Sequence, residues 1–236
     1  MEAIKQKNNW NPTDNRFVCF LDIMGFKDLV MRNSHKEIYD LLLDLSKNRE
    51  SLEDINFLPK GYDLDSLKTV SFSDSIVIFT KTDSVKCFEL LSLSVSWLFA
   101  KAIESGIAMK GCIAHGETSI NISRQIFFGQ TIIDSYLLQE DVAFYGILIH
   151  NTVENFISKN KIIPVVLDRY KECKAPLKSG KIGHLILDWT AAFTEEREIS
   201  IKENAHLVLK ALRNKTSGAP RKYIDNTIEV INEIHK

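Results

Sequence analysis

Cysteine is scarce in this sequence and nowhere paired. The four cysteines, Cys19, Cys87, Cys112 and Cys173, lie far apart, and none belongs to a CxxC motif. This spacing argues against the common structural zinc sites and against a dithiol redox centre. Isolated cysteines in a protein of ordinary composition are typical of reduced core residues, so we expect a cytoplasmic protein.

An excess of either charge is also missing. The 30 basic and 31 acidic side chains leave a net charge of −1. A dedicated nucleic-acid binder normally has a basic excess, so we expect no nucleic-acid partner. No apolar run is long enough to span a membrane, and residues 1–10 are polar, without the apolar stretch of a signal peptide. We therefore expect no membrane association.

Several familiar catalytic motifs are absent. The sequence contains no GxxxxGK[ST], no GxGxxG after a strand, no GxSxG and no HExxH. His115 follows Cys112 by three residues, which places the two side chains on opposite faces of a strand and argues against a shared zinc ion. We therefore looked for chemistry in the carboxylates.

The first notable stretch is the apolar run 17–21, which ends at Asp22. An apolar run without alternation predicts a strand covered on both faces, where an unpaired carboxylate would cost several kcal/mol. Gly25 then opens a short helix, so backbone amides of residues 23–26 lie near Asp22. A carboxylate beside such amides suits a divalent cation that carries a phosphate group.

The second stretch predicts a hairpin with an acid at its tip. Residues 67–72 and 75–79 are β-rich runs joined at Ser73 and Asp74. If this hairpin pairs beside residues 17–22, the two carboxylates meet and need a cation to neutralise them. Taken alone, Asp74 is typical of an ordinary turn residue.

The remaining N-terminal pattern predicts an α+β fold. The expected elements are helices at 26–31 and 38–45, a loop at 47–66, the hairpin at 67–80, a helix at 83–104, a strand at 107–115, a hairpin at 119–128 and a helix at 130–140. This order is βααββαβ, a ferredoxin-like antiparallel sheet with helices on one face. Gly111 within its strand indicates either a bulge or the close approach of a ligand or a partner backbone.

The C-terminal third gives weaker patterns. We expect strands at 144–149, 162–167 and 184–189, a basic loop at 171–183, and helices at 151–159, 193–213 and 221–235. The predicted organisation is a flexible lead-in (1–15), a main domain (16–145) and a mixed extension packed on it (146–236) that helps to shape a dimer.

Four segments in this order resemble the class III nucleotidyl cyclases. Residues 20–26 resemble that family's metal-binding strand and phosphate turn, and residues 73–75 resemble its second metal site, with serine where glycine is usual. Residues 110–117 look like its RxGIxxG strand, and residues 129–135 occupy the place of the helix that follows. The similarity covers about residues 16–140.

The resemblance implies a site for two divalent ions, Mn²⁺ or Mg²⁺, above which a nucleoside triphosphate cyclises. The metal ligands would be Asp22, the Ile23 carbonyl and Asp74, and the amides of Met24, Gly25 and Phe26 would hold phosphate. Such domains carry half of each site, so the resemblance implies a head-to-tail homodimer.

The departures from the family concern the base and the transition state. Val70 and Ile126 stand where purine-cyclising members have polar base-reading residues, and Ile133 and Leu137 replace the asparagine and arginine of the last helix. The chain is therefore either an inactive cyclase or similar to the bacterial branch that cyclises pyrimidine nucleotides in anti-phage signalling. The latter resemblance implies uridylate cyclase activity, with cytidylate cyclase activity as the alternative, and a separate effector that reads the product.

A cation for the transition state is then missing, and Lys110 and Arg124 are the candidates, with plain solvent exposure as the alternative. Two other functions stay open. One is a catalytically silent nucleotide-binding sensor with the same fold. The other is a palm-type nucleotidyltransferase, against which the neutral net charge argues.

Overall fold

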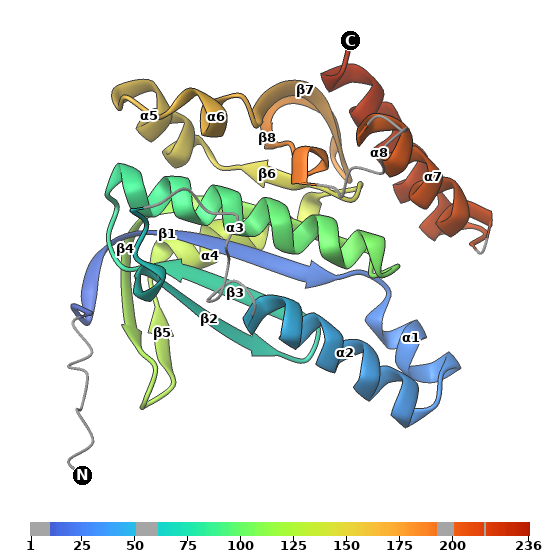
Figure 1. Ribbon diagram of the computed structural model, residues 1–236, viewed down its shortest axis with the longest axis horizontal. Coiled ribbons are helices and arrows are strands. Elements are labelled where there is room, and N and C mark those ends of the chain that lie inside the picture. The colour runs from blue at the N-terminus through green and yellow to red at the C-terminus, as the bar shows by residue number, and fades with distance from the viewer. Residues whose placement is uncertain (1–9, 51–60, 193–200, 215) are drawn as a thin grey trace.

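The computed structural model describes residues 10–50, 61–192, 201–214 and 216–236 of the 236-residue chain (Figure 1). The strands are β1 (Thr13–Ile23), β2 (Leu67–Phe72), β3 (Ser75–Thr80), β4 (Met109–Asn121), β5 (Ile126–Phe128), β6 (Ile147–Ile149), β7 (Tyr170–Leu177) and β8 (Gly180–Leu187). The helices are α1 (Phe26–Arg32), α2 (His35–Glu50), α3 (Val85–Glu104), α4 (Gln130–Asp141), α5 (Asn151–Lys159), α6 (Pro164–Leu167), α7 (Ile201–Asn214) and α8 (Ala219–Ile234). Two short 3₁₀ helices cover Leu64–Ser66 and Thr190–Ala192.

The described strands form one eight-stranded sheet. Its order is β2-β3-β1-β4-β6-β8-β7, and β5 pairs with the far end of β4. The longest pairing joins β1 and β4 in antiparallel register, from Thr13 opposite Ser119 to Ile23 opposite Met109. The predicted α+β class and the βααββαβ order of the N-terminal part are confirmed.

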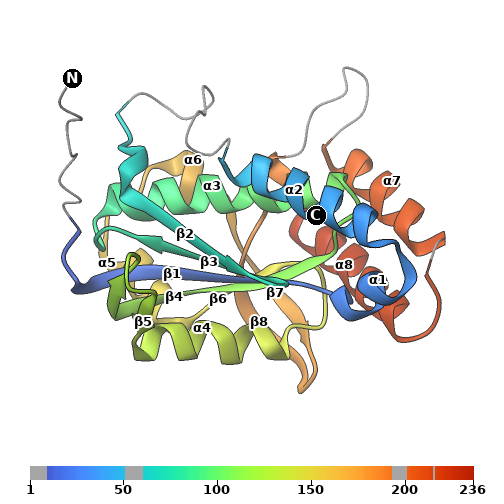
Figure 2. The ribbon, with the colours of Figure 1, turned by 90° about the horizontal axis from the view of Figure 1, so that it is seen from below.

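One detail of the predicted sheet is wrong. Helices cover both faces rather than one, because α3 lies on one side of β1 and α4 on the other (Figure 2). The apolar run of β1 explains this: Phe17, Cys19 and Leu21 join the main core, whereas Val18 joins a smaller cluster with Ile132 of α4. The strands β1 to β5 pair antiparallel, as predicted for this domain, and β6 of the extension joins the sheet by pairing in parallel with β4.

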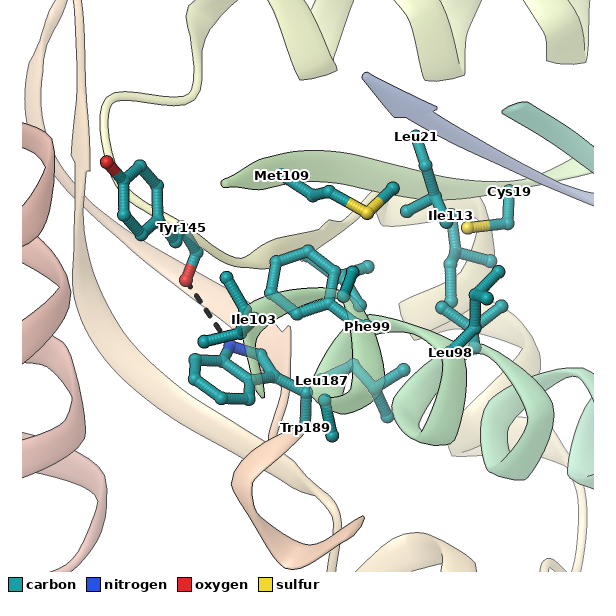
Figure 3. Packing of buried hydrophobic residues seen from close by; sticks show 14 of the residues in the cluster. Cys19, Leu21, Leu98, Phe99, Ile103, Met109, Ile113, Tyr145, Leu187 and Trp189 are labelled. Carbon is teal, nitrogen blue, oxygen red and sulfur yellow. Dashed lines mark hydrogen bonds between the residues drawn. The ribbon is translucent and has the colours of Figure 1, made fainter. Parts of the chain in front are cut away.

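The main core lies between the sheet and α3. This helix starts at the N-cap Ser84, as the sequence predicted, and it is buried on most of its circumference. Phe99 of α3 packs against Trp189 from the C-terminal part (Figure 3), and their ring centroids are 5.2 Å apart. Trp189 Nε1 donates a hydrogen bond to the Tyr145 carbonyl at 3.3 Å. The C-terminal third thus shares a core with the N-terminal part, while the predicted boundary at residue 145 stays a prediction.

Several predicted boundaries need correction. β1 begins at Thr13, inside the expected lead-in, and α2 extends to Glu50; residues 1–9 and 51–60 lie outside the described part. The predicted strand 162–167 contains helix α6 instead, because Pro164 suits the first turn of a helix.

The predicted basic loop 171–183 is in fact the β7–β8 hairpin. Cys173 and Ala175 of β7 are buried and alternate with the exposed residues Glu172 and Lys174, a period-2 pattern that the lysines obscure. Within the described residues, no helix is both long and apolar enough to cross a membrane.

Gly111 of β4 marks the close approach of two strands rather than a bulge. The register of β1 and β4 continues through it, with Gly111 opposite Leu21. A Cβ atom at this position would lie 2.5 Å from Leu21 Cδ2 and 2.7 Å from the Phe20 carbonyl oxygen. The expected approach of a partner backbone is therefore what the structure shows.

We predict that Gly111→Ala destabilises the protein by about 1–3 kcal/mol, because the added methyl group meets backbone that cannot move aside. Urea unfolding monitored by circular dichroism measures the change. Gly183→Ala is the matched control, since its added Cβ meets nothing within 4 Å, and its effect should stay within about 0.5 kcal/mol. Equal stability of the two variants would contradict the close approach.

Candidate functional site

The two aspartates singled out in the sequence lie on neighbouring strands at one end of the sheet. Asp22, next to last in β1, pairs with Ser75 of β3. Asp74 is in the two-residue turn before β3, and its carbonyl accepts a hydrogen bond from the Ile23 amide at 2.8 Å. The backbone thus ties the hairpin tip to the end of β1 and brings the two acids together.

The hairpin turn reaches this position through one left-handed residue. Ser73 has φ +57°, a conformation that glycine adopts freely and that costs other residues some energy. Phe72 pairs with Ser75, so Ser73 and Asp74 form the whole connection. The short turn holds Asp74 at the tip.

The electrostatics of Asp22 point to a cation site. Burial raises the pKa of Asp22 to about 6; the positive charge of Lys110 opposes this rise, and the negative charge of Asp74 adds to it. The repulsion shows that the two carboxylates are close enough to interact. A half-buried carboxylate next to a second one is stabilised when a divalent cation binds both.

Lys110 belongs to this site. It is the cross-strand partner of Asp22 on β4, and only 5% of it is exposed. Its Nζ atom donates to the Glu140 carbonyl at 3.4 Å and lies 4.0 Å from Glu140 Oε1. Burial lowers the pKa of Lys110, and the nearby carboxylate of Glu140 opposes that shift.

The predicted phosphate-binding amides are only partly available. The Met24 amide donates to the Ala108 carbonyl at 2.8 Å, which corrects its expected role. Gly25 has φ +69° and turns the chain into α1, while the Phe26 side chain packs on the main core. Phosphate binding by the amides of Gly25 and Phe26 stays a prediction.

The structure does not bring Arg124 to Asp22 within one chain. Arg124 lies in the exposed turn between β4 and β5, beyond the end of β4 at Asn121. A strand rises about 3.3 Å per residue, so the part of β4 from Lys110 to Asn121 spans more than about 30 Å. Arg124 therefore lies near the opposite end of the sheet.

Val70 and Ile126 do not belong to one cluster of packed side chains. Val70 packs against the small cluster that contains Phe127. Ile126 is next to Phe127 in β5, and alternate strand residues face opposite sides, so Ile126 faces away from that cluster and is 46% exposed. The base pocket proposed from these two positions stays a prediction.

The sequence reasoning missed the last turn of α4, which forms one wall of the site. Glu140 holds Lys110, and Gln139, only 1% exposed, lies close enough to Asp22 to lower its pKa. A signal was present: Thr131, Ser135 and Gln139 recur at helical spacing and are buried.

The opposite stripe of α4 is apolar and exposed. Ile133, Tyr136 and Leu137 are 50%, 44% and 59% exposed and share one helix face. Phe128 of β5 is 62% exposed and Phe72 at the hairpin is 84% exposed. Neighbouring exposed apolar side chains such as Ile133, Tyr136 and Leu137 are typical of an interaction surface.

The donor set fits a hard divalent cation. Asp22 and Asp74 offer carboxylate oxygens, and the Ile23 carbonyl is adjacent in sequence. Oxygen donors of this kind suit Mg²⁺ and Mn²⁺. In the part of the chain that the structure describes, no cluster of three or more histidine, cysteine or acidic side chains is arranged for a metal, so this site would rely on two carboxylates and on its substrate.

Comparisons with solved structures identify the fold. A bacterial light-regulated adenylyl cyclase is 9% identical, with a TM-score of 0.50, over 86% of this chain and 100% of that chain. The guanylate cyclase domain of RhGC from Catenaria anguillulae, solved with GTP, is 14% identical with a TM-score of 0.49, over 74% and 96%. The adenylyl cyclase CyaB from P. aeruginosa is 14% identical with a TM-score of 0.48, over 80% and 98%.

No protein-family model and no curated protein sequence matches this chain. At identities of 9–14% the structural likeness concerns the fold. The chain therefore has the fold of the light-regulated adenylyl cyclase, a cyclase fold of the kind that the resemblance implied.

Proposed function

We propose that the protein is a metal-dependent nucleotidyl cyclase that converts UTP into 3′,5′-cyclic UMP and pyrophosphate. The observation that carries the proposal is the meeting of Asp22 and Asp74 at the ends of neighbouring strands, joined by the Ile23–Asp74 backbone hydrogen bond. The cyclase fold of the structural neighbours supports the same reaction class.

The residues of the candidate site would have the following roles in this reaction. Asp22 and Asp74, with the Ile23 carbonyl, would hold two divalent ions, Mn²⁺ or Mg²⁺. These ions would neutralise the triphosphate and acidify the ribose 3′-hydroxyl group. Lys110 favours the ionised form of Asp22. The amides of Gly25 and Phe26 would bind the phosphates.

The choice of a pyrimidine is supported by what surrounds the proposed base positions. Val70 packs among apolar side chains, and Ile126 is apolar as well, so neither offers the polar contacts that read a purine edge. CTP, giving cyclic CMP, is the alternative substrate. By resemblance, the product would be a second messenger in antiviral defence, read by a separate effector.

The exposed apolar stripe of α4 supports a homodimer. Ile133 and Leu137 leave apolar surface that a second copy would bury. In a head-to-tail pair, the far end of one sheet lies beside the near end of the other. That arrangement would bring Arg124 of one protomer to the Asp22 site of its partner and so add a second cation to the one that Lys110 supplies.

The second candidate function is a catalytically silent nucleotide-binding sensor. The same apolar stripe favours it, because Ile133 and Leu137 stand where the resembling family has groups that act on the ribose and the transition state. Such a protein would bind the nucleotide without turning it over.

Incubation of the purified protein with each of the four nucleoside triphosphates and Mn²⁺, followed by mass spectrometry of the products, tests the proposal. We expect cyclic UMP and pyrophosphate from UTP, with a smaller yield of cyclic CMP from CTP. Cyclic CMP as the main product would show that the substrate is CTP rather than UTP, and the proposed cyclisation reaction would stand.

Two outcomes would overturn the proposed reaction. Nucleotide binding without any cyclic product would favour the sensor. Product that grows only when a template strand is added would indicate a palm-type nucleotidyltransferase.

A further inference from the structure

A buried polar stripe along α4 faces the strands that carry the candidate site. Thr131, Ser135 and Gln139 follow one another at four-residue spacing and are 2%, 0% and 1% exposed. The hydroxyl group of Thr131 donates to the Glu117 carbonyl, and that of Ser135 donates to the Ile132 carbonyl. Two of the three buried groups therefore have partners.

Gln139 differs from the other two. Among the described residues, neither its amide nitrogen nor its amide oxygen has a hydrogen-bond partner, although both atoms are shielded from solvent. An amide buried in this way lowers stability unless it has another role, because it has lost its hydrogen bonds to water. The amide lies close enough to the Asp22 carboxylate to lower its pKa.

Contacts of the two residues that follow Gln139, Glu140 and Asp141, fix the end of the helix that carries it. The next residue, Glu140, accepts a hydrogen bond from Lys110 through its backbone carbonyl. Asp141 is anchored by the β7–β8 turn, since its carbonyl accepts from the Lys178 amide at 2.7 Å and its side chain accepts from the Ser179 hydroxyl group at 2.5 Å. The last turn of α4 is thus pinned beneath the end of β1 (Figure 2).

We infer that Gln139 is a positioning residue of the cation site, which donates its amide N–H to one oxygen of Asp22 and leaves the other oxygen to the cation. The inference rests on the proposed cation role of Asp22 and extends it to a residue of α4. Groups that hold a metal-ligating carboxylate in place commonly change metal affinity by about 10- to 100-fold when they are removed.

The inference also gives the β7–β8 hairpin a part in the site. Its turn residues Lys178 and Ser179 fix Asp141, and Asp141 ends the helical turn that carries Gln139. The C-terminal third would therefore support the geometry of Asp22 without contacting it.

The test compares Mn²⁺ binding by the full chain without nucleotide, measured by electron paramagnetic resonance of free Mn²⁺. Gln139→Met keeps the size and flexibility of the side chain but removes the amide. We expect its dissociation constant to rise about 10- to 100-fold while its melting temperature stays equal or increases, because a buried amide with no complete hydrogen bond is lost. Gln130→Met, an exposed glutamine of the same helix, is the matched control and should bind Mn²⁺ like the wild type.

Wild-type affinity for Mn²⁺ in Gln139→Met would overturn the inference, because the amide would then contribute nothing to the cation site.

The proposed function can fail separately. A wild-type protein that binds Mn²⁺, loses affinity in Gln139→Met and makes no cyclic nucleotide would refute the cyclase and keep the positioning role. A wild-type protein whose Mn²⁺ binding is absent, or does not depend on Asp22, would refute the cation site and this inference together.

Discussion

If the protein cyclises UTP as proposed, Asp22→Asn and Asp74→Asn will each lower the rate of that reaction by about 1,000-fold or more. Each substitution removes a charged ligand from a site that has only two carboxylates, and charge neutralisation by metal ions accounts for several kcal/mol of transition-state stabilisation. Initial rates with UTP and Mn²⁺, measured across a range of Mn²⁺ concentrations, give the size of the loss.

The fold should survive these substitutions. Burial raises the pKa of Asp22 to about 6, so the folded protein gains nothing from the charge, and an asparagine of the same shape should not lower the melting temperature. Asp40→Asn, on the exposed side of α2, is the control for an unrelated acid and should keep full activity. Activity within tenfold of wild type in either site variant would contradict the two-carboxylate site.

Mixing two inactive variants tests whether each site is shared between protomers. If Arg124 acts on the Asp22 site of its partner, an Asp22→Asn chain and an Arg124→Ala chain together rebuild one intact site. Equal amounts that exchange freely should recover about a quarter of wild-type activity, because half of the dimers are mixed and each of these has one complete site of two. No recovery despite proven exchange would show that Arg124 does not complement Asp22 across the dimer.

The second large effect concerns stability. Arg16→Met should lower the free energy of unfolding by about 3–5 kcal/mol. Arg16 is completely buried, and its guanidinium group donates to the carbonyls of Asn11, Thr80, Lys81 and Thr118. Methionine would remove this donor from the buried residues Thr80 and Thr118. It would also remove the cation that lies 5.0 Å from the centre of the Trp10 ring.

Urea unfolding followed by tryptophan fluorescence measures this change, with an unchanged m-value as the sign of a pure stability effect. Arg124→Met makes the same replacement in an exposed turn and should stay within about 0.5 kcal/mol. Arg16→Lys, which keeps a charge and some donors, should fall between the two and remains measurable if the methionine variant does not fold. A cost below about 1 kcal/mol for Arg16→Met would show that solvent replaces these hydrogen bonds.

The pairing of Asp22 and Asp74 could be predicted because its causes are local. Two features predict it, and each can be recognised within a few residues of sequence. One is an apolar run that ends in an acid, and the other is a two-residue turn between β-rich runs. The only non-local step was the pairing of the hairpin with β1, and the unbroken apolar character of residues 17–21 favoured neighbours for that strand.

The support of the site could not be predicted in the same way. Gln139 lies near Asp22, and Glu140 contacts Lys110, only because α4 crosses the face of the sheet. Helical periodicity predicts which side of a helix is buried, but it does not predict which strands that side packs against. In α4 the usual order is also inverted, with Thr131 and Ser135 buried and Ile133 and Leu137 exposed. A search for an apolar core stripe therefore selects the wrong side.

The C-terminal errors have a similar origin. The strand β7 was predicted as a loop because lysines between its buried residues obscure the two-residue period. The helix α6 was predicted as a strand because its β-branched residues favour a strand, whereas Pro164 starts a helix there. Arg16 is missed for another reason. Composition predicts an arginine at the end of a polar segment to be solvated, whereas backbone carbonyls of Asn11 and of three distant residues accept hydrogen bonds from it.

The buried cysteines make the protein a convenient starting point for labelling. All four are free and buried, and burial raises the pKa of Cys19, Cys112 and Cys173 above the usual value for a thiol. Because alkylating reagents attack the exposed thiolate, a cysteine introduced on the surface would react first, without prior removal of the native four. A fluorophore or a cross-linker could thus be attached to the exposed face of α4 in the otherwise native chain.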